Sequence, residues 1–295
     1  MQDLATPFLT TRELADLLRI KERKVYELAA ADAVPCLRVT GKLLFPAREI
    51  EAWLAHHTTG NDAWSTESAQ VFAGSHDPLL EWALRESGAD LATHFDGSEN
   101  GLDRFADGGA LATALHLHEP ELDDWNVTTV ARRFGHAPVV LVEFAWRERG
   151  LIVAESEVAT YADGIAALRG RRVVPRQPGA GSQGVLDHLL HTAGIAANEL
   201  DFTPPARTET DAALAILEGK ADAALGLLDL ARRYRLGFVP LLRERFDLLI
   251  DRRAWFEPPM QSFLAFCRSE RFREKAAESF GYDISGFGRV HFNGG

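Results

Sequence analysis

Residues 170–193 read GRRVVPRQPGAGSQGVLDHLLHTA, which is the pattern of a strand, a tight turn and a helix. Residues 170–175, with valines at 173 and 174, predict a short strand, the Gly- and Pro-containing residues 176–182 a turn, and residues 183–193 a helix. The same pattern occurs earlier, in residues 71–87 (VFAGSHDPLLEWALRES). Strands that alternate with helices are typical of a parallel α/β sheet. The chain is therefore expected to contain an α/β domain that uses this unit twice.

Further strands and helices are expected around these two units. Apolar runs predict strands at residues 91–95, 110–115, 138–145, 150–154, 221–225, 238–241 and 246–250. Apolar spacing predicts helices at residues 79–87, 102–107, 211–217, 260–267 and 270–279. Because the strand at 246–250 is expected to return to the first half, we predict two lobes. Lobe 1 is about 69–150 plus 242–295, and lobe 2 is about 151–241.

Each of the two turns places a serine hydroxyl where a helix is expected to begin, Ser75 in the first unit and Ser182 in the second. The first amides of a helix lack intrahelical partners and carry the positive end of its dipole, so such a turn binds anions. One turn in each lobe would let the lobes close on a small anion from both sides. Each serine alone is also compatible with an ordinary helix N-cap, and the sequence leaves this alternative open.

The first 58 residues have the pattern of a separate small domain. Thr10 and Glu13 have the spacing of a capping box at the start of a helix, and a second amphipathic helix is expected at residues 22–30. A hairpin with glycine in its turn is expected at residues 37–45, and Pro46 is expected to open a third helix. Helix, turn, helix, hairpin and helix is the layout of a winged helix-turn-helix.

Charge is distributed unevenly between the predicted domains, which are residues 1–58, a polar linker at 59–68, and residues 69–295. The chain has 32 Lys and Arg against 43 Asp and Glu, a net charge of −11. Residues 1–58 contain eight basic and eight acidic residues, so the remainder carries the whole excess. An acidic chain is a poor general binder of nucleic acid, but the neutral first domain removes this objection. One neutral domain contacts few phosphates, so we expect a homodimer on a two-fold DNA site.

Composition excludes several classes of protein. No run approaches the ~18 apolar residues that span a bilayer, and the N-terminus lacks the pattern of a secretory signal. Two cysteines, Cys36 and Cys267, form neither a disulfide framework nor a metal knuckle. We therefore expect a soluble, cytoplasmic protein without a membrane partner.

The first domain resembles a known DNA-binding family. The run LTTRELADLL (9–18), followed by Val25-Tyr26 and by Pro35 and RVTGK (38–42), resembles the excisionase and MerR-like winged helix-turn-helix. The resemblance implies that the second helix enters the major groove of double-stranded DNA and that the hairpin touches the backbone. The residues that it assigns to DNA are Lys21, Arg23, Lys24, Tyr26, Arg38, Lys42 and Arg48. The alternative is a protein-interaction module with a solvated charged face.

Residues 69–287 resemble a second family. Its motifs appear in order as GSHDPLL (74–80), HL with a following Asn126 (116–126), GLIVA (150–154), RQPGAGS (176–182), GKADAALG (219–226) and GYDISG (281–286). They resemble the type II periplasmic-binding-protein-like domain of bacterial regulators, which is similar to molybdate- and tungstate-binding receptors. The resemblance implies ligand contacts by Ser75, His76, Ser98, His116, Asn126, Arg176, Gly181 and Ser182. The family usually has arginine after the turn hydroxyl, where this chain has Gln183, and often asparagine where it has Pro175.

Together the two resemblances imply a one-component transcriptional regulator that senses a molybdate- or tungstate-like oxyanion and is not an enzyme. The rival hypothesis is a cytoplasmic solute-binding or carrier protein whose first domain binds protein. Residues 181–184, Gly-Ser-Gln-Gly, do not form a nucleophile elbow. His94, His116 and His118 lack the close Cys or carboxylate partners of a metal site. No cofactor or metal is expected.

Overall fold

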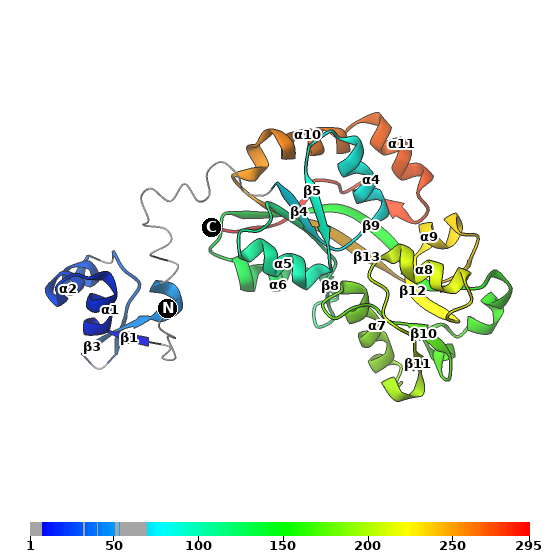
Figure 1. Cartoon of the computed structure of the whole chain (residues 1–295), viewed down its shortest axis with the longest axis horizontal. Helices are drawn as coiled ribbons and strands as arrows, with labels where there is room; N and C mark the ends of the chain where they lie inside the picture. Colours follow the sequence, from blue (N-terminus) through cyan, green and yellow to red (C-terminus); the bar gives the residue numbers. More distant parts are fainter. Residues whose placement is uncertain (1–7, 32, 40, 51–52, 54–69) are drawn as a thin grey trace. The chain divides into compact units, whose positions relative to one another are not determined.

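The computed structural model describes residues 8–31, 33–39, 41–50, 53 and 70–295. The chain divides into two compact units, residues 1–66 and 67–295 (Figure 1). The predicted linker at 59–68 lies outside the described residues, as does the end of the predicted third helix.

The first unit has two helices and a small antiparallel sheet. Helix α1 (Thr11–Leu18) begins with the predicted capping box, because Thr10 N donates to Glu13 Oε2 at 2.7 Å and Glu13 N donates to Thr10 Oγ1 at 3.3 Å. Helix α2 spans Glu22–Ala30. Its apolar face, with Val25 fully buried, packs on α1 and on the sheet. The capping box and the second helix are therefore confirmed.

The sheet of this unit differs from the prediction in one respect. Strands β2 (Leu37–Val39) and β3 (Lys42–Pro46) form the predicted hairpin. A third strand, β1 (Phe8–Thr10), pairs with β3 and gives the order β1-β3-β2. Pro46 ends β3, and helical residues begin at Ala47. A strand of three residues directly before a helix cap carries too little alternation to be recognised in the sequence.

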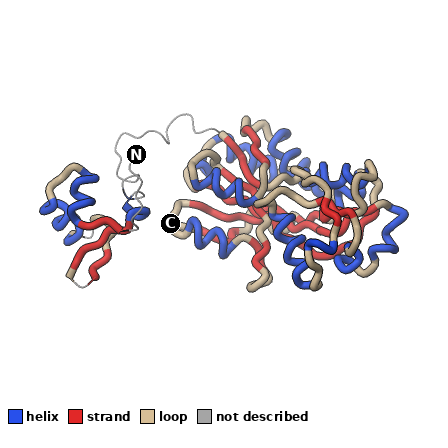
Figure 2. The backbone as a smooth tube through the Cα atoms, turned by 60° about the horizontal axis from the view of Figure 1, so that its bottom comes forward, coloured by secondary structure: helices blue, strands red, loops and turns tan. Residues whose placement is uncertain are grey.

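The second unit is a two-lobed α/β domain built on one continuous sheet, as Figures 1 and 2 show. The strand order is β11-β10-β12-β9-β13-β6-β4-β5. The lobe 1 strands are β4 (Val71–Gly74), β5 (Ala92–Phe95) and β6 (Ala112–Leu115), and the lobe 2 strands are β10 (Arg172–Val174), β11 (Asp201–Phe202) and β12 (Ala223–Leu227). Within each group these strands pair in parallel, so the predicted α/β class is confirmed.

Two long antiparallel strands connect the lobes. Strand β9 (Val139–Val153) and strand β13 (Gly237–Asp251) each have 15 residues and pair along their whole length. Toward lobe 2, β9 pairs with β12; toward lobe 1, β13 pairs with β6. The sequence predicted four short strands here, separated at the charged residues 146–149 and 242–245. That prediction was wrong, because Arg147 and Arg149 of the first run pair with Glu244 of the second inside the protein, and the strands continue through both runs.

Helices cover both faces of the sheet in each lobe (Figure 1). In lobe 1, α4 (Pro78–Glu86), α10 (Pro258–Cys267) and α11 (Glu270–Glu278) pack on one face, and α5 (Ser98–Ala106) and α6 (Val127–Phe134) on the other. In lobe 2, α7 (Gly181–Thr192) and the 3-10 helices Glu155–Tyr161 and Gly164–Leu168 pack on one face, and α8 (Glu209–Leu217) and α9 (Leu228–Arg233) on the other.

Short elements complete the domain. They are β7 (His118–Glu119) paired with β8 (Asp124–Trp125), β14 (Tyr282–Asp283) and β15 (Val290–Asn293) at the edge of β9, and the 3-10 turns Ala197–Glu199 and Ala254–Phe256. Among the described residues, no helix combines the length and the apolar character needed to cross a membrane.

Candidate ligand site and DNA interface

The turn after β4 brings two of the predicted serines together. Ser75 Oγ lies 2.7 Å from Ser98 Oγ, and Ser98 Oγ accepts a hydrogen bond from His116 N at 3.2 Å. Ser75, Ser98 and His116 are at most 3% exposed. Gly74 precedes them with a φ of +107°, and an added Cβ would lie 2.2 Å from the Ala114 carbonyl oxygen, so this turn requires glycine.

Neither predicted serine caps a helix. The N-cap of α4 is Asp77, whose Oδ1 accepts from Leu80 N at 2.7 Å. The N-cap of α7 is Ala180, so Ser182 lies inside the first turn of that helix. The N-cap interpretation of Ser75 and Ser182 is therefore wrong, and their hydroxyls are used elsewhere.

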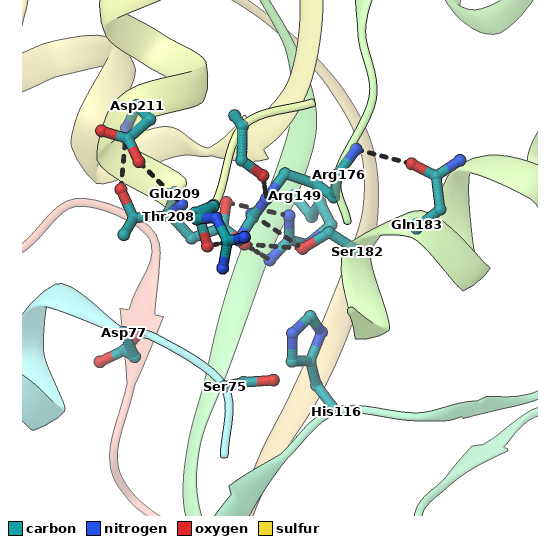
Figure 3. A network of polar contacts seen from close by, with 12 residues as sticks. Ser75, Asp77, His116, Arg149, Arg176, Ser182, Gln183, Thr208, Glu209 and Asp211 are labelled. Carbon is teal, nitrogen blue, oxygen red and sulfur yellow. Dashed lines mark hydrogen bonds and ion pairs between the residues drawn. The ribbon is translucent and has the colours of Figure 1, made fainter. Parts of the chain in front are cut away.

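In lobe 2 the predicted ligand residues converge on a carboxylate of the chain itself (Figure 3). Ser182 Oγ donates to Glu209 Oε1 at 2.7 Å, and Arg176 Nη1 lies 2.9 Å from the same oxygen. Arg149, from β9, binds both oxygens of Glu209, at 3.1 and 3.3 Å. Arg149 is fully buried and Glu209 is 1% exposed.

A chain of buried ion pairs runs from this point into lobe 1. Glu244, on β13, accepts from Arg149 Nε at 2.7 Å and from Arg147, and its Oε2 lies 3.0 Å from His116 Nδ1. Arg147 Nη1 in turn donates to Asp77 Oδ2 at 2.8 Å. Glu244 and Arg147 are fully buried. The network therefore joins lobe 2, both connecting strands and the first turn of lobe 1.

The charges of this network balance. Three arginines (Arg147, Arg149 and Arg176) face three carboxylates (Asp77, Glu209 and Glu244). Burial alone would raise the pKa of Glu209 and of Glu244, but the adjacent arginines outweigh it and hold both pKa values below the ordinary range. Burial lowers the pKa of His116, although Glu244 acts in the opposite direction. Buried charges that are paired in this way are tolerated, and an unpaired one is costly.

The two lobes touch at the start of α7. Glu99 N donates to the Gly179 carbonyl oxygen at 3.1 Å, and Gly181 packs against His116. A cleft of about 940 Å³ lies beside this contact and is lined by both lobes. Arg176 and Gly181 contribute to its wall. Its size is within the range of small-molecule sites.

Two predicted ligand residues have other partners. His76 Nε2 lies 3.2 Å from Glu81 Oε2. Asn126 is fully buried; its Nδ2 donates to Asp247 Oδ2 at 2.7 Å, and its Oδ1 accepts from Leu117 N at 2.6 Å. The structure thus brings together Ser75, Ser98, His116, Arg176, Gly181 and Ser182, and it places the side chains of His76 and Asn126 in separate contacts.

Sequence reasoning missed the ionic residues at the centre of this region. Arg147 and Arg149 are two residues apart in a strand, so they face the same side of the sheet, and the intervening Glu148 is half-buried on the other side. Glu244 lies on the adjacent strand β13, and its side chain is likewise fully buried. The sequence did contain a signal: two short charged runs, each between two apolar runs. Such runs can lie on adjacent buried strands, where their opposite charges neutralise each other.

The residues predicted to meet DNA lie on α2 and its N-cap, on the hairpin and, for Arg48, in the helical residues that follow Pro46. Arg23 and Lys24 have side chains that are 90% and 59% exposed, and both pair with Glu27 at 3.3 Å. Tyr26, on the same helix, is 54% exposed. Lys21 is the N-cap of α2, and Lys42 and Arg48 are exposed.

Arg38 has a contact within its own domain. Its Nη2 donates to the Ala29 carbonyl oxygen at 2.8 Å. Ala29 belongs to the last turn of α2, so this hydrogen bond joins the hairpin to that helix.

Metal ligation has no support within the described part of the chain, where no group of three His, Cys, Asp or Glu side chains is placed to hold an ion. His94 pairs with Arg104 at 3.1 Å, and His116 pairs with Glu244. The His118 ring lies against His188, with centroids 4.8 Å apart.

Fold and site together define the class of protein: a two-lobed solute-binding domain joined to a helix-turn-helix domain. Residues 81–268 match the PBP superfamily domain, and residues 8–58 match a helix-turn-helix domain. Because the first match covers more than half of the sequence, the chain belongs to the PBP superfamily. Neither match is to an enzyme family. This pair of domains fits a DNA-binding regulator with a ligand-sensing domain.

Individual proteins are similar to this chain over most of its length. The uncharacterized protein YvgK of Bacillus subtilis (strain 168) is 23% identical over 308 residues, covering 97% of this chain and 98% of that protein. A putative phosphate ABC transporter substrate-binding protein from Clostridium perfringens, solved with bound phosphate, has a TM-score of 0.53 at 12% identity over 73% of this chain and 99% of that chain. The CcmR regulatory domain of Synechocystis PCC6803 in complex with 2-PG has a TM-score of 0.50 at 11% identity over 66% and 93%.

Proposed function

We propose that this protein is a one-component transcriptional regulator whose two-lobed domain binds a small ligand and thereby changes the affinity of its helix-turn-helix domain for double-stranded DNA. The observation that carries the proposal is that one chain combines a helix-turn-helix domain, whose α2 exposes Arg23 and Lys24, with a two-lobed domain whose lobes meet beside a cleft. A regulator of this kind acts on DNA, so we place it in the cytoplasm.

For the ligand, we propose a small oxyanion of the molybdate or tungstate type, bound by the residues that the two turns supply. Ser182 and Arg176 are a hydroxyl and a guanidinium next to the start of α7, where a helix favours negative charge. The similar structure from Clostridium perfringens holds phosphate, another oxyanion. The Glu209 carboxylate occupies these same donors, so a ligand that binds them must compete with it.

For the assembly, we propose a homodimer. The first domain is neutral overall, and Glu27 pairs with both Arg23 and Lys24, so few positive charges of one copy are free for phosphates. Counterion release scales with the number of phosphates contacted. Two copies on a two-fold site double that number and make binding strong enough to be specific.

The test is selection of DNA duplexes from a randomised pool with the full chain, followed by affinity measurements across a salt series. We expect a specific sequence to emerge and its affinity to fall steeply with salt. The double variant Arg23→Ala/Lys24→Ala should weaken binding at least tenfold and flatten the salt dependence. The matched control, Arg268→Ala/Arg273→Ala, removes two exposed arginines from the sensor and should bind as the wild type does.

Two outcomes would contradict the proposal. One is the failure of any sequence to emerge from the selection; the other is unchanged DNA affinity in Arg23→Ala/Lys24→Ala. Either result favours the rival hypothesis of a solute-binding protein whose first domain contacts another protein.

A further inference from the structure

The Glu209 carboxylate is bound in the way that a free anion would be. Its Oε1 accepts from Ser182 Oγ at 2.7 Å and lies 2.9 Å from Arg176 Nη1. Arg149 reaches both of its oxygens, at 3.1 and 3.3 Å. Two guanidinium groups and a hydroxyl thus surround a carboxylate that is 1% exposed.

Capping of α8 does not explain this position. Thr208 is the N-cap of α8, and its Oγ1 accepts from Asp211 N at 3.0 Å. Asp211 Oδ2 accepts from Thr208 N in return, also at 3.0 Å. This capping box serves the helix without Glu209, so the buried carboxylate has a different role.

Arg176 is fixed so that one of its N–H groups is directed at this carboxylate. Its Nε donates to the Ala206 carbonyl oxygen at 3.0 Å, and its Nη2 donates to the Arg207 carbonyl oxygen at 2.9 Å. Nη1 is thereby left facing Glu209 and Ser182. A guanidinium held by two backbone carbonyls is a preorganised donor for an anion, because its orientation does not depend on the occupant.

An additional anion would disturb the charge balance of this network. With Glu209 in place the buried arginines and carboxylates are equal in number, and like charges repel strongly where water is excluded. An external anion therefore reaches Arg149, Arg176 and Ser182 only if Glu209 leaves them.

We propose that Arg149, Arg176 and Ser182 form an anion site whose occupant in this form of the protein is Glu209, and that Glu209 determines which ligands the sensor accepts. An external carboxylate or oxyanion binds there in exchange for Glu209, one anion for another. Exchange of the anion also affects lobe 1. Arg149 donates to Glu244, and Glu244 contacts His116 in lobe 1. The inference deepens the proposed function, because it concerns the ligand class of the same site.

The experiment is anion rescue of a cavity at this position, with thermal unfolding of the full chain as the readout. The proteins are the wild type, Glu209→Ala, and Glu218→Ala as a matched control. Glu218 ends the same helix, is half-exposed and pairs with Lys220 at the surface. Each protein is unfolded in sodium formate and in sodium chloride at equal concentration. Sodium molybdate is then titrated into each by calorimetry.

In chloride, Glu209→Ala should unfold at a lower temperature than the wild type, because Arg149 and Arg176 lose a shared partner. Formate, a carboxylate without the side-chain methylenes, should raise its unfolding temperature saturably and leave the wild type and Glu218→Ala nearly unchanged. Molybdate should bind Glu209→Ala at least tenfold more tightly than the wild type. Adding Ser182→Ala to Glu209→Ala should reduce the formate effect, which a purely structural role of Glu209 would not predict.

Equal effects of formate on all three proteins would overturn the inference. If Glu209→Ala does not fold in chloride, its refolding yield decides instead: a yield restored by formate supports the anion site, and equal yields in both salts overturn it. None of these readouts involves DNA. A failure here therefore leaves DNA binding by the first domain standing, and loss of specific DNA binding leaves the rescue result unaffected.

Discussion

Asp247 is a buried carboxylate with an unusual titration. It is fully buried on β13, accepts from Asn126 Nδ2 at 2.7 Å and from Arg245 Nε at 2.9 Å. Burial raises its pKa to about 6, outweighing Arg245 and the Asn126 hydrogen bond, which act in the opposite direction. Its pKa is thus higher in the folded protein than in the unfolded chain.

This pKa predicts the sign of a pH effect on stability. The folded state binds the Asp247 proton more tightly, so the stabilisation is complete below about pH 4 and is lost as the pH rises through about 6. Between pH 4 and pH 7, we expect the free energy of unfolding of the wild type to fall relative to that of Asp247→Asn by up to about 3 kcal/mol. Urea denaturation at each pH measures this difference. Parallel pH profiles of the two proteins would contradict the assignment.

Individual site residues could be predicted from the sequence only where a local pattern marks them. Ser75 and Ser182 follow short turns before expected helices, Ser98 was assigned through the family resemblance, and the structure places all three next to the contact between lobes. Glu209 has no such mark, because a glutamate in the first turn of a helix normally favours the helix dipole from the surface. Its burial depends on Arg149, which is distant in sequence.

At the scale of elements, the two strands that connect the lobes depend on close backbone packing at Gly150. Gly150 pairs with Pro240, and a Cβ added to it would lie 2.1 Å from the Val239 carbonyl oxygen. The register of the pair shifts just beyond, between Pro240 and Leu242. A side chain at Gly150 therefore cannot be accommodated unless β9 and β13 separate.

We expect Gly150→Ala to lower the free energy of unfolding by about 2–4 kcal/mol, since the strands must move apart at the junction of the lobes. Chemical denaturation measures the loss. Gly184→Ala is the control, because nothing lies within 4 Å of an added Cβ there and alanine favours a helix. Equal stability of Gly150→Ala and the wild type would show that the strands are not packed as described.

Most elements of the two lobes could be predicted, because apolar strands and amphipathic helices alternate regularly. Several elements could not, and two of them show the reason. The charged residues inside β9 and β13 resemble loops until their partners on the adjacent strand are known. Helix α6 begins with Val127, Thr128, Thr129 and Val130, whose β-branched side chains disfavour a helix, and it forms because Val130 and Phe134 are buried under the sheet.

At the scale of the whole molecule, charge is divided unevenly between the two units. The first 58 residues are neutral and the rest carries the net charge of −11. Under the proposed function, the acidic second unit does not attract DNA by itself, so specific binding would come from the first domain and from the proposed pairing of two copies. In the proposed function, the conformation of the two-lobed domain changes the affinity of the first domain for DNA.

Gly181 allows the coupling to be tested without knowledge of the ligand. A Cβ at Gly181 would lie 2.5 Å from the His116 carbonyl oxygen and 2.9 Å from its ring, across the contact between the lobes. Gly181→Ala should therefore hold the lobes apart and increase the radius of gyration in solution scattering. Gly184→Ala, on the same helix, has open space around the added atom and should leave the lobes closed.

The most direct test is the dissociation constant of these two variants for the selected DNA duplex, measured by fluorescence anisotropy at one salt concentration. We predict that the constants of Gly181→Ala and Gly184→Ala differ at least fivefold, because the lobes and the DNA-binding domain share one conformational equilibrium. Equal constants, with an increased radius of gyration in Gly181→Ala, would contradict ligand-responsive DNA binding.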